Sequence, residues 1–98
     1  MTNFTAQEER GRYEITAKGH ATGEDPAVCA GISAILYSLA GLLDNTPEIK
    51  SECIFLDEGD AHFIFSGGAE ARTAYDMTVI GIAQIAESYP GYILANFL

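Results

Sequence analysis

The chain has 98 residues, of which 48% are hydrophobic and 19% are charged, so its composition is that of a globular domain and not of a disordered chain. With 14 acidic and 5 basic residues it carries a net charge of −9, which disfavours binding to nucleic acid phosphates or anionic membranes. We therefore expect one domain over residues 1–98, no direct nucleic acid binding, and a basic protein as partner.

The N-terminal segment and the two cysteines favour a cytoplasmic location. Residues 1–11 contain no continuous apolar stretch, so we expect no signal peptide. We also expect no segment with the roughly 20 apolar residues of a membrane span. Cys29 and Cys53 lie in different sequence contexts and suggest no disulfide framework. Because a domain of this size buries only about 60–65% of its unfolded surface, a partner subunit or a ligand would stabilise it, which favours a dimer.

The first predicted elements are the two strands of a β-hairpin. Apolar residues alternate over residues 3–8 and 12–18, and Arg10-Gly11 supplies a turn between them. A two-residue loop sets the register of this hairpin. In that register the facing pairs are Phe4 with Ala17, Ala6 with Ile15, and Glu8 with Tyr13.

A helix follows, and then a second hairpin. Apolar residues recur at helical spacing until residues 44–47 end the pattern, namely Val28, Ile32, Ile35, Leu36, Leu39 and Leu43. Glu58-Gly59 is typical of a hairpin turn between strands at residues 48–57 and 60–66. This hairpin pairs Ile54 with Phe63 and Leu56 with Ala61. Its opposite face is expected to meet a subunit or a loop, because it carries Cys53, Phe55, His62 and Ile64.

A second helix completes the predicted fold. An apolar stripe runs along residues 69–88, and Pro90 stops it. The order of elements is ββαββα. We therefore expect an α+β domain in which an antiparallel sheet carries two helices packed on one face.

His20 and Cys29 carry most of the predicted chemistry. Asp25 is a favourable N-cap and Pro26 suits the first helical position, which puts Cys29 in the first turn or just beyond it. The amides and the helix dipole at this position favour a nucleophilic thiolate, and the same amides are candidates for holding an oxyanion. His20 ends the second strand, and the loop of eight residues that follows is short enough for its imidazole to meet the sulfur.

A purely structural interpretation competes with this dyad. Free cysteines are often small buried hydrophobes, and a lone histidine at a strand end is ordinary. Spacing alone favours this structural interpretation, because one Cys with one His is a weak signal.

The sequence around these two residues resembles the signature of the ribosomal-processing cysteine proteases. The similar segments are Gly19-His20-Ala21 and, after a short loop, Val28-Cys29-Ala30-Gly31-Ile32-Ser33, together with residues 85–90 and Tyr92 near the C-terminus. The resemblance implies a homodimeric endopeptidase that removes the N-terminal extension of the large-subunit ribosomal protein number twenty-seven, with no cofactor. A basic ribosomal substrate suits a chain with a net charge of −9.

Carried over by position, the resemblance implies that Cys29 is the nucleophile and His20 the general base. Gly19 and Ala21 then keep the surroundings of the histidine small. Ser33 lies one helical turn after the cysteine and helps to shape the site, unless its hydroxyl bonds only to its own backbone.

The chain departs from the family pattern in the loop between the two residues. The loop is shorter than in the family, and Pro26 stands where the family has an Asp. Asp25 is one place earlier, where we expect it to act as a helix cap. The shorter loop also fits a related peptidase that acts on a phage structural protein.

Two other classes of function stay open. One is a non-catalytic dimeric module that holds a basic protein, favoured if Cys29 has an ordinary thiol pKa and is closed to solvent. The other is redox chemistry, in which Cys29 forms a sulfenic acid and Cys53 approaches it in space. We expect no metal site, because Cys53 and His62 lack the close paired spacing of a zinc site. Asp57, Glu58 and Asp60 are expected to form a solvated turn.

Overall fold

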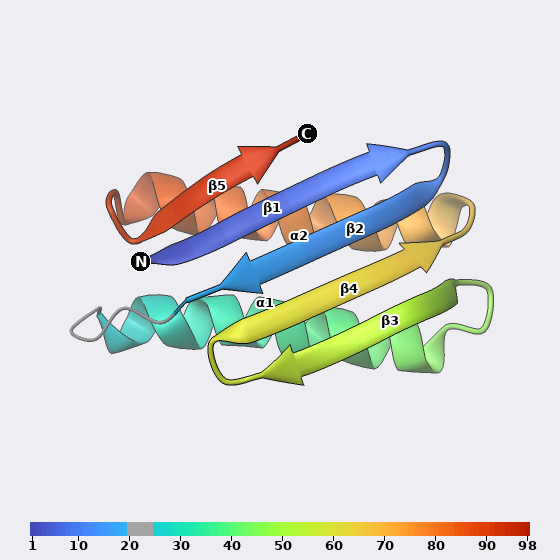
Figure 1. Cartoon of the computed structure of the whole chain (residues 1–98), viewed down its shortest axis with the longest axis horizontal. Coiled ribbons are helices and arrows are strands. Elements are labelled where there is room, and N and C mark those ends of the chain that lie inside the picture. Colours follow the sequence, from blue (N-terminus) through green and yellow to red (C-terminus); the bar gives the residue numbers. More distant parts are fainter. Residues whose placement is uncertain (20–24) are drawn as a thin grey trace.

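The computed structural model describes residues 1–19 and 25–98. Its elements are β1 (Thr2–Glu9), β2 (Arg12–Lys18), α1 (Pro26–Asn45), β3 (Lys50–Asp57), β4 (Asp60–Ser66), α2 (Ala69–Ser88) and β5 (Ile93–Phe97). The strands form one sheet in the order β3-β4-β2-β1-β5, and both helices cover the same face (Figure 1). The predicted α+β class, the ββαββα order and the two helices on one face are confirmed.

Both predicted hairpins form in the predicted register. In the first, Phe4 pairs with Ala17 and Ala6 with Ile15. Its turn residues Arg10 and Gly11 have φ angles of 53° and 78°, which a two-residue hairpin loop needs if its twist is to match that of the strands. In the second, the predicted pairs of residues 54 with 63 and 56 with 61 both occur. Alternating apolar residues with a short turn between them were therefore sufficient to set the register.

The sequence did not predict β5, which makes the sheet mixed instead of purely antiparallel. This strand lies parallel to β1, with Thr2 opposite Ile93 and Ala6 opposite Phe97. Gly91, with a φ of 91°, lets the chain reverse after α2. The backbone N–H of Leu98 then donates to the carbonyl of Ala6 at 2.7 Å. A five-residue edge strand that pairs with the other end of the chain leaves no local pattern from which to predict it.

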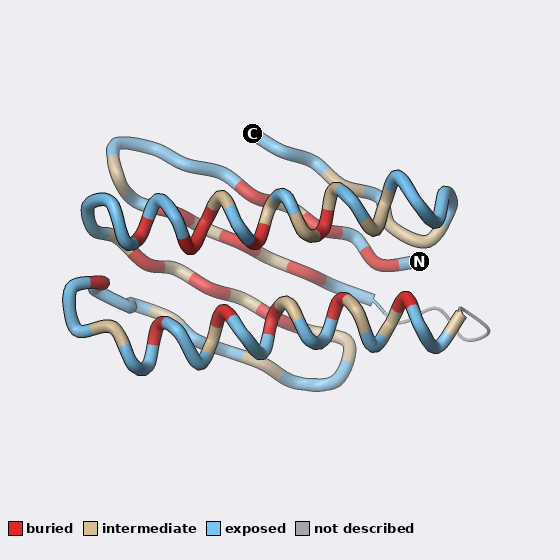
Figure 2. The backbone as a smooth tube through the Cα atoms, turned by 180° about the vertical axis from the view of Figure 1, so that it is seen from behind, coloured by how far each residue is buried: buried red, intermediate tan, exposed pale blue. Residues whose placement is uncertain are grey.

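The core lies between the sheet and the helices. Figure 2 shows the buried positions of each helix on the side turned toward the other helix and the middle of the molecule, whereas the outer sides of the helices are mostly exposed. The sheet contributes Phe4, Ala6, Tyr13, Ile15, Ala17, Ala61, Phe63 and Phe65 to the core, and the helices contribute Val28, Ile32, Leu36, Leu39, Leu43, Ala71, Ala74, Tyr75 and Ile82. All six apolar positions predicted for the first helix face or adjoin this core.

Two glycines let the helices pack closely against each other. A Cβ on Gly81 of α2 would lie 2.8 Å from Cδ1 of Ile35, and a Cβ on Gly31 of α1 would lie 3.2 Å from Cδ1 of Ile85. Real Cβ atoms are rarely this close to a neighbour, so larger residues would push the helices apart. Because Gly31 comes two residues after Cys29, this contact helps to fix the start of α1.

The length and composition of α1 correct one sequence expectation. Among the described residues, α1 is a helix long and apolar enough to cross a membrane, although no such segment was expected. The reason is that Asp44 is the one charged residue in this helix. The core helices of globular domains can be equally long and apolar. One face of α1 is buried at residues 28, 32, 36, 39 and 43.

The face of the sheet away from the helices carries a polar network among its apolar residues. His62 Nε2 lies 2.6 Å from Glu14 Oε2, and the Gln7 amide donates to the other carboxylate oxygen at 2.9 Å. These hydrogen bonds, that of His62 first, hold the pKa of Glu14 below its usual value. Cys53 Sγ also donates to the backbone carbonyl of His62 at 3.5 Å. Cys53 and His62 therefore interact with each other on the side of the sheet away from Cys29.

Candidate active site

Cys29 is partly buried in the first turn of α1, where the sequence predicted it. Asp25 has an extended backbone, with φ −60° and ψ 123°, and its Oδ1 accepts a hydrogen bond from Ala27 N at 2.9 Å. Pro26 occupies the first helical position, where its missing N–H costs no helical hydrogen bond. The role of Asp25 as N-cap is therefore confirmed.

The same capping residue engages the backbone amides of the first turn. The carbonyl of Asp25 accepts from Val28 N at 3.0 Å and from Cys29 N at 3.3 Å. Ala27 N donates to the Asp25 carboxylate, and Pro26 has no N–H to offer. These are the amides that the sequence suggested as oxyanion donors. In this structure an oxyanion would have to compete with Asp25 for these amides. The bond from Cys29 N is the longest of the three and therefore the easiest to replace.

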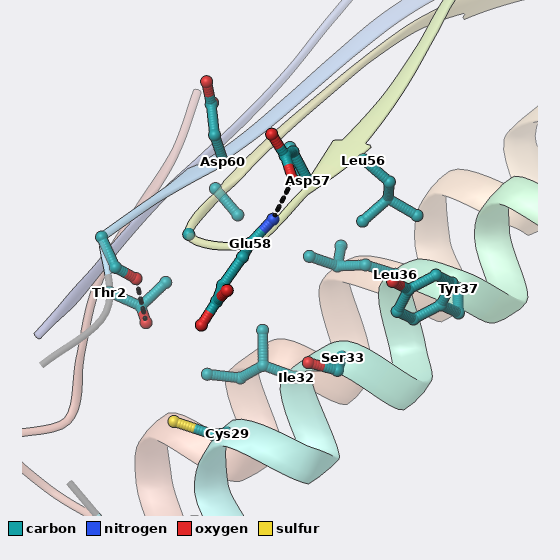
Figure 3. Close-up of a pocket in the computed structure, with 14 residues that line it drawn as sticks. Thr2, Cys29, Ile32, Ser33, Leu36, Tyr37, Leu56, Asp57, Glu58 and Asp60 are labelled. Carbon is teal, nitrogen blue, oxygen red and sulfur yellow. Dashed lines mark hydrogen bonds between the residues drawn. The ribbon is translucent and has the colours of Figure 1, made fainter. Parts of the chain in front are cut away.

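Cys29 lines a cavity of about 410 Å³ between α1 and one end of the sheet (Figure 3). The wall formed by α1 consists of Cys29, Ile32, Ser33, Leu36 and Tyr37. The wall formed by the sheet and its turns consists of Thr2, Ala17, Gly19, Leu56, Asp57, Glu58, Gly59, Asp60 and Ala61. Its volume lies within the range of about 300–1,000 Å³ that is typical of ligand pockets.

The cavity brings together three of the six residues that the sequence singled out. Cys29 and Ser33 lie one helical turn apart on the same wall, and Gly19 lines the cavity from the end of β2. Asp25 precedes the helix as its cap. His20 and Ala21 lie outside the described residues, so the dyad stays a prediction.

Gly19 is fixed from two directions. Its N–H donates to the Gly59 carbonyl at 2.9 Å, and its own carbonyl accepts from Thr2 Oγ1 at 3.2 Å. Its φ of +101° is unfavourable for any residue with a side chain, and a Cβ here would lie 2.7 Å from the carbonyl oxygen of Met1. A glycine at this position is therefore required by the backbone, and it joins β1, β2 and the β3–β4 turn at the cavity.

We expect Gly19→Ala to lower the free energy of unfolding by roughly 1–3 kcal/mol, because the new methyl group meets both an unfavourable φ and the Met1 carbonyl. Urea denaturation measures this change. Gly41→Ala is the matched control, since nothing lies within 4 Å of a Cβ at that helical position. The control should be as stable as the wild type or more stable. A Gly19→Ala variant with unchanged stability would show that this backbone contact is easily relieved.

The sequence did not predict that the β3–β4 turn would lie beside Cys29. The predicted turn forms, but Asp57, Glu58 and Asp60 all line the cavity. The turn reaches this place because β4 pairs with β2, which sets Asp60 opposite Lys18 at the end of β2. This pairing joins segments far apart in the sequence, so no local motif connects the turn with the cysteine.

Cys53 lies on the other side of the sheet from Cys29. In β3 and β4, the residues Ile54 and Phe63 face the helices, so the neighbouring pair of Cys53 and Ile64 faces away from them. Because the sheet separates the two sulfur atoms, Cys53 cannot act as a resolving cysteine for Cys29 in this fold. The redox alternative is therefore left without a second thiol to react with an oxidised Cys29.

Comparison with known proteins decides the family. The sequence matches the family described as cysteine protease Prp over residues 1–94. The chain belongs to this family. It is accordingly a cysteine protease, and the predicted resemblance to the ribosomal-processing cysteine proteases is confirmed. Among curated proteins, none has a sequence that matches the chain.

Solved structures share the fold across the whole chain. The essential ribosomal processing protease Prp from S. aureus, in complex with a covalently linked product peptide, has a TM-score of 0.83 at 21% identity, with 100% of each chain covered. The same S. aureus protease with a substrate peptide has a TM-score of 0.73 at 19% identity, again with 100% of each chain covered. SMU.848 from Streptococcus mutans has a TM-score of 0.77 at 20% identity, with 100% of this chain and 94% of that chain covered. At such identities the likeness shows the fold, while family membership rests on the sequence match.

Proposed function

We propose that this chain is a cytoplasmic endopeptidase that removes the N-terminal extension of a basic ribosomal protein, the large-subunit protein number twenty-seven, with Cys29 as nucleophile and His20 as general base. The observation that carries the proposal is the position of Cys29, in the first turn of α1 on the wall of a cavity, in a chain of the cysteine protease Prp family. The S. aureus relative is a ribosomal processing protease that has been solved with a substrate peptide, which supports the choice of substrate.

The position of Cys29 also favours the reactive form of its side chain. The positive end of a helix dipole stabilises a nearby anion by about 0.3–1 kcal/mol. The first turn of α1 contains no acidic residue to oppose this effect, and the Asp25 carboxylate that precedes it is already bonded to Ala27 N. A thiolate at Cys29 is therefore easier to form than one in the middle of a helix.

In the proposed mechanism His20 takes the thiol proton of Cys29, and the thiolate attacks the carbonyl carbon of the scissile peptide bond. The tetrahedral intermediate collapses when protonated His20 gives its proton to the leaving nitrogen, which becomes the new N-terminus of the mature protein. The removed extension stays bound as a thioester of Cys29. Water, deprotonated by His20, then hydrolyses the thioester and restores the thiol.

The direct test is a processing assay. The purified chain is mixed with the ribosomal protein carrying its N-terminal extension, and mass spectrometry follows the mass of the product. We expect a single cut near the N-terminus, because an exposed extension can enter the cavity while the folded remainder cannot. The same ribosomal protein without the extension is the control and should stay intact. An uncut extended protein would argue against this substrate.

We also propose that two copies pair through the outer faces of α1 and α2. An apolar groove of about 310 Å³ lies between the helices, lined by Ala34, Ile35, Ser38, Leu39, Leu42, Ala74, Met77 and Thr78. Leu42 and Met77 at this groove are 46% and 71% exposed, which leaves a large apolar surface in contact with water. Two chains that each carry a charge of −9 repel one another, so this groove, whose described lining residues include no acid, is a favourable place for their association.

Met77→Lys is expected to shift the dimer to monomer, because the interface would have to bury an ammonium group without a partner. The change makes the net charge less negative, so a loss of dimer cannot be ascribed to general repulsion. Sedimentation equilibrium measures the effect. Phe55→Lys, on the other face of the sheet, is the matched control and should leave the dimer intact. If only Phe55→Lys dissociates it, the open face of the sheet forms the interface instead.

A further inference from the structure

Glu58 stands out among the residues that line the cavity. In Figure 3 its side chain extends from the β3–β4 turn toward α1, between Thr2 and Ile32 and in the direction of Cys29. The residue is exposed to solvent. A peptide bound with its scissile bond at Cys29 would therefore pass close to a carboxylate.

The two neighbouring acids of the turn have different roles. Asp57 Oδ1 accepts a hydrogen bond from the backbone N–H of Glu58 at 2.8 Å, which orients the turn. Asp60 Oδ1 lies 4.0 Å from Lys18 Nζ, so this carboxylate is close to a cation of the chain itself. Figure 3 shows both aspartates pointing away from Cys29. Of the three acids, Glu58 is the one directed into the cavity.

The surroundings of Glu58 suit a side chain with a long apolar stem and a charged end. Ile32, Leu36 and Leu56 form apolar parts of the cavity walls, against which a methylene chain can pack. Among the described residues that line the cavity there is no Lys or Arg. Lysine and arginine have this combination of apolar stem and cationic end, whereas an acidic side chain would be repelled by the turn.

We propose that Glu58 is a specificity-determining residue, which binds a lysine or arginine side chain of the substrate close to the scissile bond. The inference rests on the proposed peptidase function, because it assumes that the peptide bond is held at Cys29. It narrows the substrate from a basic protein to a peptide with a basic residue at a fixed distance from the cut.

The test is a double-mutant cycle with peptides that copy the N-terminal segment of the ribosomal protein. Each basic residue of the peptide is replaced in turn by norleucine, which keeps the stem and removes the charge. For one position we expect kcat/KM of the wild type to fall about fivefold, the size of an exposed charge pair. Glu58→Gln should show the same fall with the unmodified peptide and no further loss with that norleucine peptide. Glu87→Gln, an acid of α2 that does not line the cavity, is the control for overall charge.

Reversing the charge at position 58 provides a second test of the specificity. Glu58→Lys should prefer a peptide with glutamate at the selected position over the unmodified peptide. The inference would be overturned if, at every peptide position, the losses of kcat/KM from Glu58→Gln and from norleucine were additive. So would a Glu58→Gln variant that cleaves all peptides more slowly by the same factor, since Glu58 would then act on the catalytic groups and not on the substrate.

A binding measurement separates this inference from the proposed function. The same cycle is repeated by titration calorimetry on the Cys29→Ala variant, which holds peptides without cleaving them. Charge-dependent binding through Glu58 without any cleavage by the wild type would overturn the peptidase and leave the specificity residue standing. Cleavage by the wild type, together with binding that does not depend on the charge at position 58, would overturn the role of Glu58 in specificity and leave the peptidase function standing.

Discussion

Cys29→Ala is expected to abolish processing of the extended ribosomal protein, with a fall in kcat/KM of roughly a thousandfold or more, because no other group can form the thioester. The fold should persist. Cys29 is only partly buried, and the change to alanine removes one sulfur atom at the wall of a cavity that already exists. Rates of processing, together with a urea denaturation curve, measure both effects.

Cys53→Ala is the matched control for this substitution. Cys53 is also a partly buried thiol, but it lies on the other face of the sheet and its Sγ donates to the His62 carbonyl. We expect this variant to process the substrate at the wild-type rate, with a loss of stability of about 1 kcal/mol or less from the weak hydrogen bond. Normal processing by Cys29→Ala would exclude the covalent mechanism, whatever the control shows.

The elements that the sequence predicted are those with strong local signals. The turn of Arg10-Gly11 and the alternating apolar residues beside it set the register of the first hairpin, which pairs Phe4 with Ala17 as expected. In the same way Asp25-Pro26 marks the start of α1, because capping depends on neighbours in sequence. Local chemistry was therefore enough to place Cys29 in the first helical turn.

The features that the sequence did not predict depend on contacts between distant segments. β5 exists because β1 offers it an open edge, and its pairing joins residues near the two ends of the chain, such as Thr2 and Ile93. The place of Glu58 beside Cys29 follows from the pairing of β2 with β4. Neither has a local signature. The second wall of the cavity, and with it the candidate for substrate specificity, became visible only in the folded chain.

The hydrogen bonds that the first-turn amides of α1 make with Asp25 could be predicted only in part from the sequence. A sequence with Asp at the N-cap predicts that its carboxylate takes one amide, and Ala27 N is indeed its donor. The bond from Cys29 N to the Asp25 carbonyl is the first hydrogen bond of the helix and follows from the N-cap position, so the bond from Val28 N is the one that capping alone does not predict. Stabilisation of the oxyanion is consequently the part of the chemistry in which Asp25 competes with the substrate.

His20→Ala is expected to lower kcat/KM by about 10²–10⁴-fold and to raise the pKa of the Cys29 thiol toward its ordinary value of about 8.5. The direction follows from charge: an imidazolium beside the sulfur stabilises the thiolate and lowers its pKa, so removing the imidazole raises it. The rate of alkylation of Cys29 by iodoacetamide, measured against pH in a Cys53→Ala background, reports the thiolate fraction. In the wild type the midpoint of this profile should lie well below that of the variant.

The chain contains one other histidine, which provides the control. His62 pairs with Glu14 on the other face of the sheet, away from the cavity, so His62→Ala should leave the alkylation profile of Cys29 unchanged. If the wild-type alkylation profile has an ordinary midpoint, and neither His20→Ala nor His62→Ala changes it, then Cys29 has no base. Since Cys29 also lines a cavity with an acidic turn, the chain would then bind basic peptides there without cutting them, and the acidic wall around Glu58 would be the functional part of the site.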